Sequence, residues 1–224
     1  DPTYGAVSVQ LTDPTTVTVQ RMGTTGDVTV QWSVVSFSAG VSVQRGSTAL
    51  TGTETGVPLT AVDLTKTFPL TTTRLWGTTW GDNEFVRSWF PSSSELRLSV
   101  RDLSSQVVEW QVVEYQDAVV QHGNHFFGAA MTTMWTSIGT PVDPAASWLV
   151  YSYTSEAGTA ADIGQKLVLG SVTGVDELMF SRENLGSAFD LSWHLVEFTD
   201  GTAVQHGIEA FSASQETADV TISS

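Results

Sequence analysis

The segment that decides the fold is residues 110–123, WQVVEYQDAVVQHG, because its pattern occurs three times along the chain. Residues 32–46 read WSVVSFSAGVSVQRG, and residues 193–207 read WHLVEFTDGTAVQHG. The tryptophans that open the three copies, 78 and 83 residues apart, are Trp32, Trp110 and Trp193. Self-similarity at a regular spacing is typical of proteins built from repeated structural units. We therefore expect tandem copies of one unit of roughly 80 residues.

Each copy has the pattern of short β-strands joined by turns. Strand-like segments at 17–21, 96–101 and 178–182 precede the three tryptophans. A turn then leads into the Trp strand, and a second turn leads into the Val-Gln-x-Gly strand. Asp200-Gly201 in the third copy is a strong hairpin signal, so we expect these last two strands to pair with each other. Closely spaced short strands predict an all-β fold of tandem β-sandwich-like units, mostly antiparallel.

The Trp strand is apolar on both faces. Trp110, Val112 and Glu114 share one face in a period-two pattern, and Val113 and Tyr115 share the other. A strand of this kind belongs in the centre of a sheet with cover on both sides. We therefore expect the three repeat tryptophans to occupy equivalent, mostly buried positions.

Two glutamates on these strands require partners. Glu114 and Glu197 stand among apolar neighbours, where a carboxylate must be paired. Arg101 and Arg182, which end the preceding strands, predict the ion pairs Arg101–Glu114 and Arg182–Glu197. The first copy has Ser36 at the position of these glutamates.

The copies suggest a division of the chain. We expect a truncated first repeat at 1–56, a second at 57–130, a third at 131–214 and a C-terminal tail strand at 215–224. An upstream match between 68–83 and 148–164 occurs only in the last two copies.

The pattern Trp-x-Val-Val-Glu-aromatic, a turn, and then Val-Gln-(Arg/His)-Gly resembles tandem β repeats of large secreted or surface proteins of bacteria. The resemblance covers most of the chain. It implies an extracellular or cell-surface array, and it carries over no catalytic residue.

Composition excludes several classes of function. The net charge is −15 and the pI is about 4.3, with only nine Lys and Arg residues, so nucleic acid is not an expected partner. No apolar run is long enough for membrane insertion. The chain has no cysteine, which removes disulfides and thiolate chemistry. It starts at Asp1, as a processed, exported chain would.

No group of residues predicts catalysis, a metal site or a cofactor. His122 and His125 are the only closely spaced histidines. A metal site also requires a third ligand directed at the same ion, and the sequence predicts none. No Gly-x-Ser-x-Gly elbow or phosphate-binding loop occurs. Two aromatic groups remain open to a core, an interface or a sugar-stacking role; they are Trp76, Trp80, Trp89 and Phe90, and then Phe126, Phe127, Met131, Met134 and Trp135. The second group lies outside the repeated strands and is the better interface candidate.

These features favour a non-enzymatic structural protein that joins copies of itself head to tail by strand complementation, as a filament or surface-layer subunit. The alternative is a carbohydrate- or host-binding adhesin or virion fibre module, with glycans as partners. In the first case a strand at about 217–223 would enter a neighbouring copy. Val220 and Ile222 would point into that neighbour, and Asp219 and Thr221 would face outward.

Overall fold

The structure is a computed structural model that describes residues 1–37, 39–156, 162–210, 215 and 217–222. The described chain is nearly all β. In chain order the elements are α1 (Pro2–Gly5), β1 (Val7–Asp13), β2 (Thr16–Arg21), β3 (Val41–Ala49), β4 (Glu54–Pro58), η1 (Leu64–Lys66), β5 (Thr67–Arg74), β6 (Arg87–Ser92), β7 (Glu95–Ser99), β8 (Val107–Tyr115), β9 (Ala118–Phe127), β10 (Thr133–Ser137), η2 (Pro144–Ala146), β11 (Ser147–Ser155), η3 (Ile163–Gln165), β12 (Leu169–Val172), β13 (Glu177–Ser181) and β14 (Phe189–Phe198).

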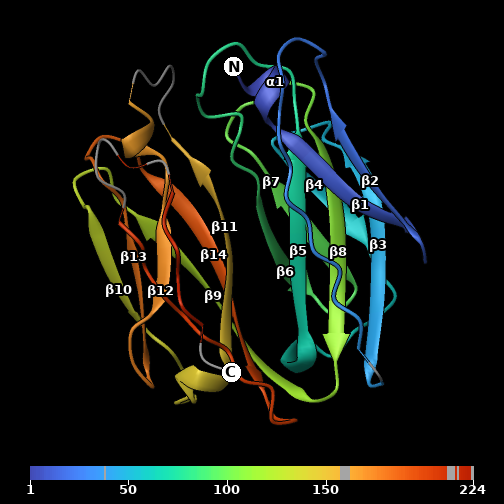
Figure 1. Ribbon diagram of the computed structural model, residues 1–224, viewed down its shortest axis with the longest axis vertical. Helices are drawn as coiled ribbons and strands as arrows, with labels where there is room; N and C mark the ends of the chain where they lie inside the picture. The colour runs from blue at the N-terminus through green and yellow to red at the C-terminus, as the bar shows by residue number, and fades with distance from the viewer. Residues whose placement is uncertain (38, 157–161, 211–214, 216, 223–224) are drawn as a thin grey trace.

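The strands form antiparallel sheets that combine into two sandwich-like units. In unit 1 (residues 41–115), sheet β3-β8-β5 packs on sheet β4-β7-β6. In unit 2 (residues 118–198), sheet β11-β14-β9 packs on sheet β10-β13-β12. The two units lie side by side, unit 2 on the left of Figure 1 and unit 1 on the right. The prediction of an all-β, sandwich-like and antiparallel fold is confirmed.

Three apolar clusters hold these layers together. In unit 1 the cluster contains the fully buried Leu96 and Leu98 of β7, together with Val108 and Val112 of β8. In unit 2 the corresponding cluster contains Leu178, Phe180, Phe189 and Leu191. The third cluster lies between the units and includes Val113, Tyr115, Ala118, Val120 and Val196. As predicted, the Trp strands β8 and β14 are central in their sheets and covered on both faces.

The predicted hairpin between each Trp strand and the following Val-Gln-x-Gly strand is wrong. Strand β8 pairs with β3 and β5, whereas β9 pairs with β14. The short turn between β8 and β9 crosses from one sheet to the sheet that faces it. It does so because Tyr115 and Ala118, on either side of the turn, both pack into the cluster between the units.

Strand pairing therefore divides the chain differently from the expected repeat boundaries. In the first two copies the Val-Gln-x-Gly strand pairs with the Trp strand of the next copy. Strand β3, expected in the repeat at 1–56, belongs to the sheet of β8, and the boundary after residue 56 falls within β4. Each complete unit is thus built from parts of two successive copies.

The register places the glycine of one copy opposite the tryptophan of the next. Gly46 pairs with Trp110, and Gly123 pairs with Trp193. A Cβ added at Gly46 would lie 2.6 Å from the Trp110 ring, and one at Gly123 would lie 2.3 Å from the Trp193 ring. The glycine leaves room for the indole to lie across the neighbouring strand, which is the usual reason for glycine within a strand.

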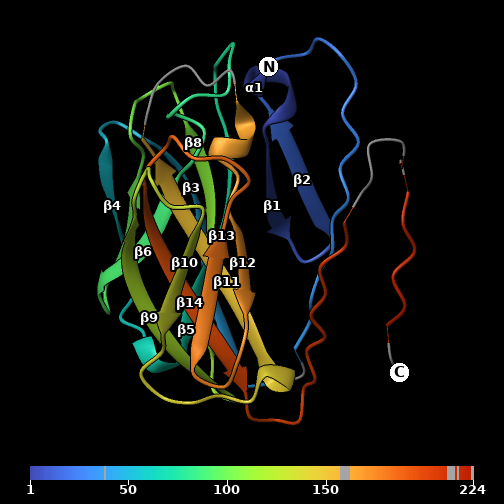
Figure 2. The same ribbon diagram turned by 90° about the vertical axis from the view of Figure 1, so that its left-hand side faces the viewer.

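The first copy departs from the expectation of three equivalent tryptophans. Its upstream strands form the hairpin β1–β2, which stands to one side of the sandwiches in Figure 2. The described residues 28–37 form no strand, and Trp32 is 58% exposed, whereas Trp193 is 4% exposed. The cause is local, because no Val-Gln-x-Gly strand lies beside Trp32 in this structure.

We predict that Gly123→Ala lowers the free energy of unfolding by about 1–3 kcal/mol, the usual cost of overpacking a core. The added methyl group must displace the Trp193 indole, which is enclosed by leucine side chains. Chemical denaturation measures the change. Gly207→Ala is the matched control, because no atom lies within 4 Å of its added Cβ. Equal losses in both variants would contradict this account of the motif.

Candidate functional site

The functional candidate is the junction at which one copy meets the next. Side chains of β14 alternate between the core of unit 2 and this junction. Leu191, Trp193 and Leu195 point into unit 2, and Val196 joins the cluster between the units. The junction is therefore continuous with the folded core.

Equivalent aromatic residues of the three copies follow one another along the junctions. Phe37 and Tyr115 have ring centroids 4.7 Å apart, and Tyr115 and Phe198 have centroids 6.2 Å apart. The Tyr115 hydroxyl also donates a 2.6 Å hydrogen bond to Asp200 Oδ2. That bond raises the pKa of Tyr115 to about 12 and lowers the pKa of Asp200 to about 2. Phe37, Tyr115 and Phe198 thus form an aromatic column, in which the same motif position of successive copies is in contact.

Polar contacts connect the hairpin of one copy to the sheet of the next. Arg87 of β6 donates to Ser192 Oγ at 2.5 Å and to Asn124 Oδ1 at 2.8 Å. The Ser88 backbone N–H donates to Ser152 Oγ of β11 at 2.8 Å.

The first hairpin meets unit 1 in a corresponding way. The Val9 backbone N–H of β1 donates to Thr72 Oγ1 of β5 at 2.9 Å, and Arg74 donates to Ser8 Oγ at 2.6 Å. Arg74 also forms a 2.6 Å ion pair with the buried Glu109. Strand β1 therefore lies against unit 1 in the way that β6 lies against unit 2.

The Val-Gln-x-Gly segments contact the preceding 3-10 helix in the same manner. His122 Nε2 lies 2.7 Å from Leu64 O of η1, and Lys66 donates to Ala118 O at 2.6 Å. In the third copy His206 Nε2 lies 2.8 Å from Ser147 O, just after η2, and the Val204 N–H donates to Ala145 O at 2.7 Å. Residues 202–210, the donor segment, therefore leave unit 2 much as β9 leaves unit 1.

A histidine pair lies in the junction between units 1 and 2, with His194 buried and His122 at the surface. His122 Nδ1 and His194 Nδ1 are 2.6 Å apart, and Phe90 of β6 packs edge-on against both rings. Burial and then the nearby His122 lower the pKa of His194 to about 3, and burial also lowers the pKa of His122. In the tautomers that satisfy Leu64 O, His122 Nε2–H donates to that carbonyl and His194 Nδ1–H donates to His122 Nδ1. The pair therefore forms a hydrogen bond that connects β9 to β14.

The two predicted Arg–Glu pairs are wrong. Arg101 forms a 2.8 Å ion pair with Glu156. The Arg182 guanidinium is enclosed by five backbone carbonyls, those of Gly128, Ala129, Met131, Gln165 and Ser187. Each arginine precedes the start of a Trp strand, while the glutamate stands near its far end. The rise of a strand separates them by more than about 20 Å.

Glu114 and Glu197 instead share one structural role. Glu114 Oε1 accepts a 3.4 Å hydrogen bond from the Asp63 N–H, and Glu197 Oε1 accepts a 2.7 Å bond from the Asp143 N–H. Both aspartates cap the 3-10 helix that precedes β5 or β11. The glutamates therefore fix the start of the strand beside them.

Apolar side chains in the first copy and at the end of the third are exposed. Residues 28–37, the acceptor segment, carry Val34 and Val35, which are 50% and 73% exposed. Their equivalents in β14, Leu195 and Val196, are fully buried. The donor segment exposes Ile208 in the same way.

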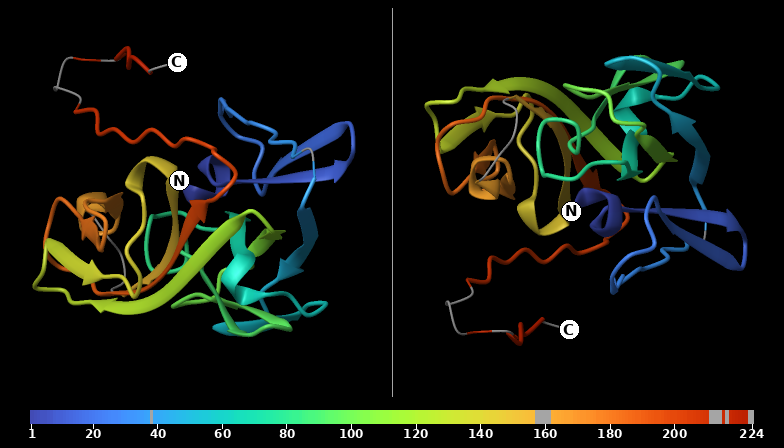
Figure 3. Two further views of the ribbon diagram at one scale, coloured as in Figure 1. Left: turned by 90° about the horizontal axis from the view of Figure 1, so that it is seen from below. Right: turned by 90° about the horizontal axis from the view of Figure 1, so that it is seen from above.

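The predicted tail strand does not form within this chain. The described residues 217–222 have no strand partner in the described structure, and Figure 3 shows them leading away from the sheets. Val220 and Ile222 are exposed, as are Asp219 and Thr221. Insertion of this segment into a neighbouring copy stays a prediction.

The second aromatic group, expected outside the repeated strands, is in fact part of unit 2. Phe127 ends β9 and Met134 belongs to β10, and both lie in the core. Phe126, Met131 and Trp135 are exposed at the surface. The better interface candidates are the donor and acceptor segments.

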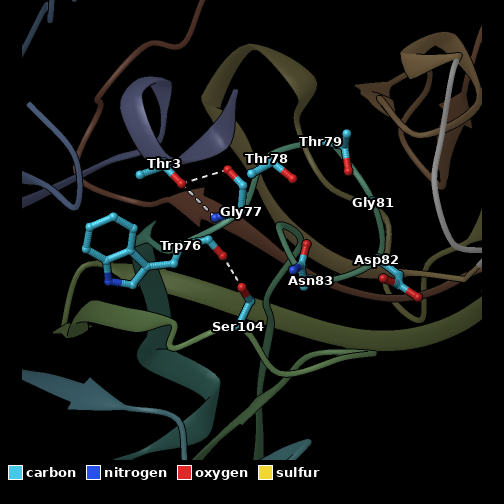
Figure 4. A pocket seen from close by; sticks show the side chains of 9 residues that line it. All are labelled: Thr3, Trp76, Gly77, Thr78, Thr79, Gly81, Asp82, Asn83 and Ser104. Atoms are coloured by element: carbon cyan, nitrogen blue, oxygen red, sulfur yellow. Dashed lines mark hydrogen bonds between the residues drawn. The ribbon is translucent and has the colours of Figure 1, made fainter. Parts of the chain in front are cut away.

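A polar pocket lies beside α1 (Figure 4). Trp76, which is about half exposed, lines it together with the threonines Thr3, Thr78 and Thr79. Asp82, Asn83 and Ser104 add further polar groups. Thr3 Oγ1 and Gly77 exchange 2.7 Å hydrogen bonds that hold α1 against this loop. An indole beside hydroxyl, amide and carboxylate groups is chemistry that suits a sugar.

Sequence reasoning missed the role of the motif glycines and of the Arg74–Glu109 pair. A recurring glycine inside an otherwise β-branched strand signals close approach by another group, and that signal identifies Gly46 and Gly123. No sequence signal identified Arg74 as the partner of Glu109, because β5 and β8 are distant in the chain.

No family model matches the chain, and no curated protein and no solved structure is significantly similar to it. Among the described residues, no helix combines the length and apolarity needed to cross a bilayer. Within the same residues, no group of three or more His, Asp or Glu side chains is gathered as metal ligands would be.

We predict that acidification destabilises the protein through the histidine pair. The folded-state pKa of His194 lies below its unfolded value of about 6.5, so its contribution to stability is complete above that pH. The contribution is lost as the pH falls from about 6.5 towards 3, by about 3 kcal/mol at pH 4. Denaturant unfolding across this range measures it. His194→Asn removes the titrating group and should flatten the pH dependence, and parallel curves for the two proteins would contradict the prediction.

Proposed function

We propose that this chain is a non-enzymatic structural subunit of an extracellular or cell-surface assembly that joins copies of itself by strand complementation. The observation that carries the proposal is the recurrence of one junction. Hairpin β1–β2 meets unit 1 as hairpin β6–β7 meets unit 2, and the aromatic column runs through both. Units that contact only their neighbours extend in one dimension.

The distribution of exposed apolar side chains supports this proposal. Val34 and Val35 in the acceptor segment, Ile208 in the donor segment, and Val220 and Ile222 in the tail are all exposed. Apolar groups gathered on such segments mark interaction sites. The net charge of −15 keeps separate subunits soluble, so association must come from backbone pairing and apolar contact.

The position of the tail in the repeat supports its role as a complementing strand. Thr133, the first residue of β10, follows Gly123 by ten residues, and Thr217 follows Gly207 by the same interval. Val220 then corresponds to Thr136, which is buried in unit 2. Ile222 corresponds in the same way to the buried Ile138. The tail would therefore take the place of β10 in a neighbouring copy.

We predict that the purified protein forms linear polymers and that Val220→Asp abolishes them. The variant buries an unpaired charge only at the subunit contact, so each subunit stays folded. Light scattering after size exclusion and negative-stain electron microscopy measure assembly, and circular dichroism measures folding. Val175→Asp, another exposed valine in the turn between β12 and β13, is the matched control and should assemble normally. A wild-type protein that stays monomeric at high concentration would contradict the proposal.

The second candidate function is carbohydrate binding, which the Trp76 pocket favours. We predict that a glycan ligand quenches tryptophan fluorescence and that Trp76→Ala weakens its binding by at least about tenfold, or 1.4 kcal/mol. Trp135→Ala, which removes an exposed indole elsewhere, is the control. A glycan array that detects no ligand, or equal binding by both variants, would exclude this pocket.

A further inference from the structure

Both complete junctions use one strand register. Strand β3 pairs with β8 so that Gly46 lies opposite Trp110, and β9 pairs with β14 so that Gly123 lies opposite Trp193. The residue three positions before the glycine lies opposite the one three after the tryptophan, as Val120 does opposite Val196. Both of these valines are buried in the cluster between the units. The register is therefore a property of the repeat that transfers to another copy of the same motif.

The described chain contains both sequences of this strand pair in an unpaired form, one in the acceptor segment and one in the donor segment. The acceptor segment has a Trp strand sequence with no Val-Gln-x-Gly strand beside it, and Trp32 is exposed. The donor segment has a Val-Gln-x-Gly sequence with no Trp strand beside it, and no atom lies within 4 Å of a Cβ built on Gly207. Trp32 therefore has no glycine opposite it in the described chain, and Gly207 has no tryptophan opposite it.

We propose that the donor segment of one subunit pairs antiparallel with the acceptor segment of a second copy of this chain, with Gly207 opposite Trp32. This pairing rests on the proposed function and specifies its contact. It places Val204 opposite Val35, the counterparts of Val120 and Val196. The two valines would then be buried together. This contact removes Val35, the most exposed valine of the acceptor segment, from water.

A second copy satisfies the geometry better than the same chain does. The acceptor segment ends at Phe37, which packs on Tyr115 beside unit 1. The donor segment begins beside η2 of unit 2, where the Val204 N–H binds Ala145 O. Within one chain the two segments approach each other at Tyr115, which packs on Phe37 and donates to Asp200, but from there the donor segment follows η2 of unit 2. Their contact joins unlike surfaces of two subunits, which is the type of contact that builds open polymers and rings.

The backbone and the charge pattern also favour a second copy of this chain as the partner of the acceptor segment. The described residues of both segments lie outside any strand ladder, and pairing with a β-strand is the contact that provides one. Residues 28–37 carry no charge, and Glu209 is the only charged residue in 202–210 apart from any charge on His206. Little electrostatic repulsion therefore opposes this contact, despite the acidic surface of the whole chain.

The first experiment exploits the empty space at Gly207. Gly207→Val should leave the subunit as stable as the parent and should raise the concentration needed for polymer formation at least about tenfold, or 1.4 kcal/mol. The added side chain would collide with Trp32 of the next copy, as a Cβ at Gly123 would collide with Trp193. Ala210→Val, three residues away on the same segment, is the matched control and should assemble normally. Combining Gly207→Val with Trp32→Ala should restore assembly, because the smaller side chain removes the collision.

The second experiment tests the register directly by cysteine cross-linking in this cysteine-free chain. The pair Val35→Cys and Val204→Cys should give disulfide-linked ladders on a non-reducing gel, because directly opposite Cβ atoms lie about 4.5–5.5 Å apart. Val34→Cys with Val204→Cys is the control, since its side chains lie on opposite faces, and it should give no ladder.

The outcomes separate this pairing from the broader function. Polymers that form normally with Gly207→Val, or that cross-link only through the control pair, overturn the register and leave the proposed assembly standing. A parent protein that forms no polymer overturns both. Polymer loss in Gly207→Val, rescue by Trp32→Ala and selective cross-linking of Val35 to Val204 together establish the contact.

Discussion

The contact between a tryptophan and a glycine of the preceding copy organises the whole structure. Trp193 lies across Gly123 and Trp110 across Gly46, each pair at matched positions of adjacent strands. The indole covers a large apolar area only where the opposite residue has no side chain. Because the two residues come from successive copies, the contact forms a unit and connects it to its neighbour at once.

This arrangement explains why the units cannot be separated at the copy boundaries. A Trp strand without a Val-Gln-x-Gly strand beside it stays unpaired, as residues 28–37 do. Its apolar residues then stay in water, whereas the equivalent residues of β14 are buried. Most of the stabilising contacts of the motif form at the junction between two copies. An array built in this way gains stability from each added neighbour. That property suits a structural role better than a catalytic one.

The junctions are formed mainly by uncharged groups in a strongly acidic protein. Aromatic rings, serine and threonine hydroxyls and a neutral histidine pair provide most of the contacts. Arg87 adds a guanidinium that donates to Ser192 and Asn124 rather than to a carboxylate. Where a carboxylate does enter a junction it has a partner, as the buried Glu109 has in Arg74 and Asp200 has in the Tyr115 hydroxyl.

Local pattern by itself determined the fold class, the repeat and the central place of the Trp strand, because side-chain alternation on β8 and β14 reports directly which faces are apolar. It also singled out the tail at 217–222 by its alternation. It did not determine which strands pair. The turn after Tyr115 looks like a hairpin turn, yet the chain crosses to a facing sheet because Tyr115 and Ala118, on either side of it, both pack into the cluster between the units. After Phe198 the described chain joins no sheet. Strand partners, and hence the partners of Arg101, Glu114, Arg182 and Glu197, were decided by contacts between distant segments. Only the tertiary structure contains that information, since local sequence is the same whichever neighbour a strand acquires.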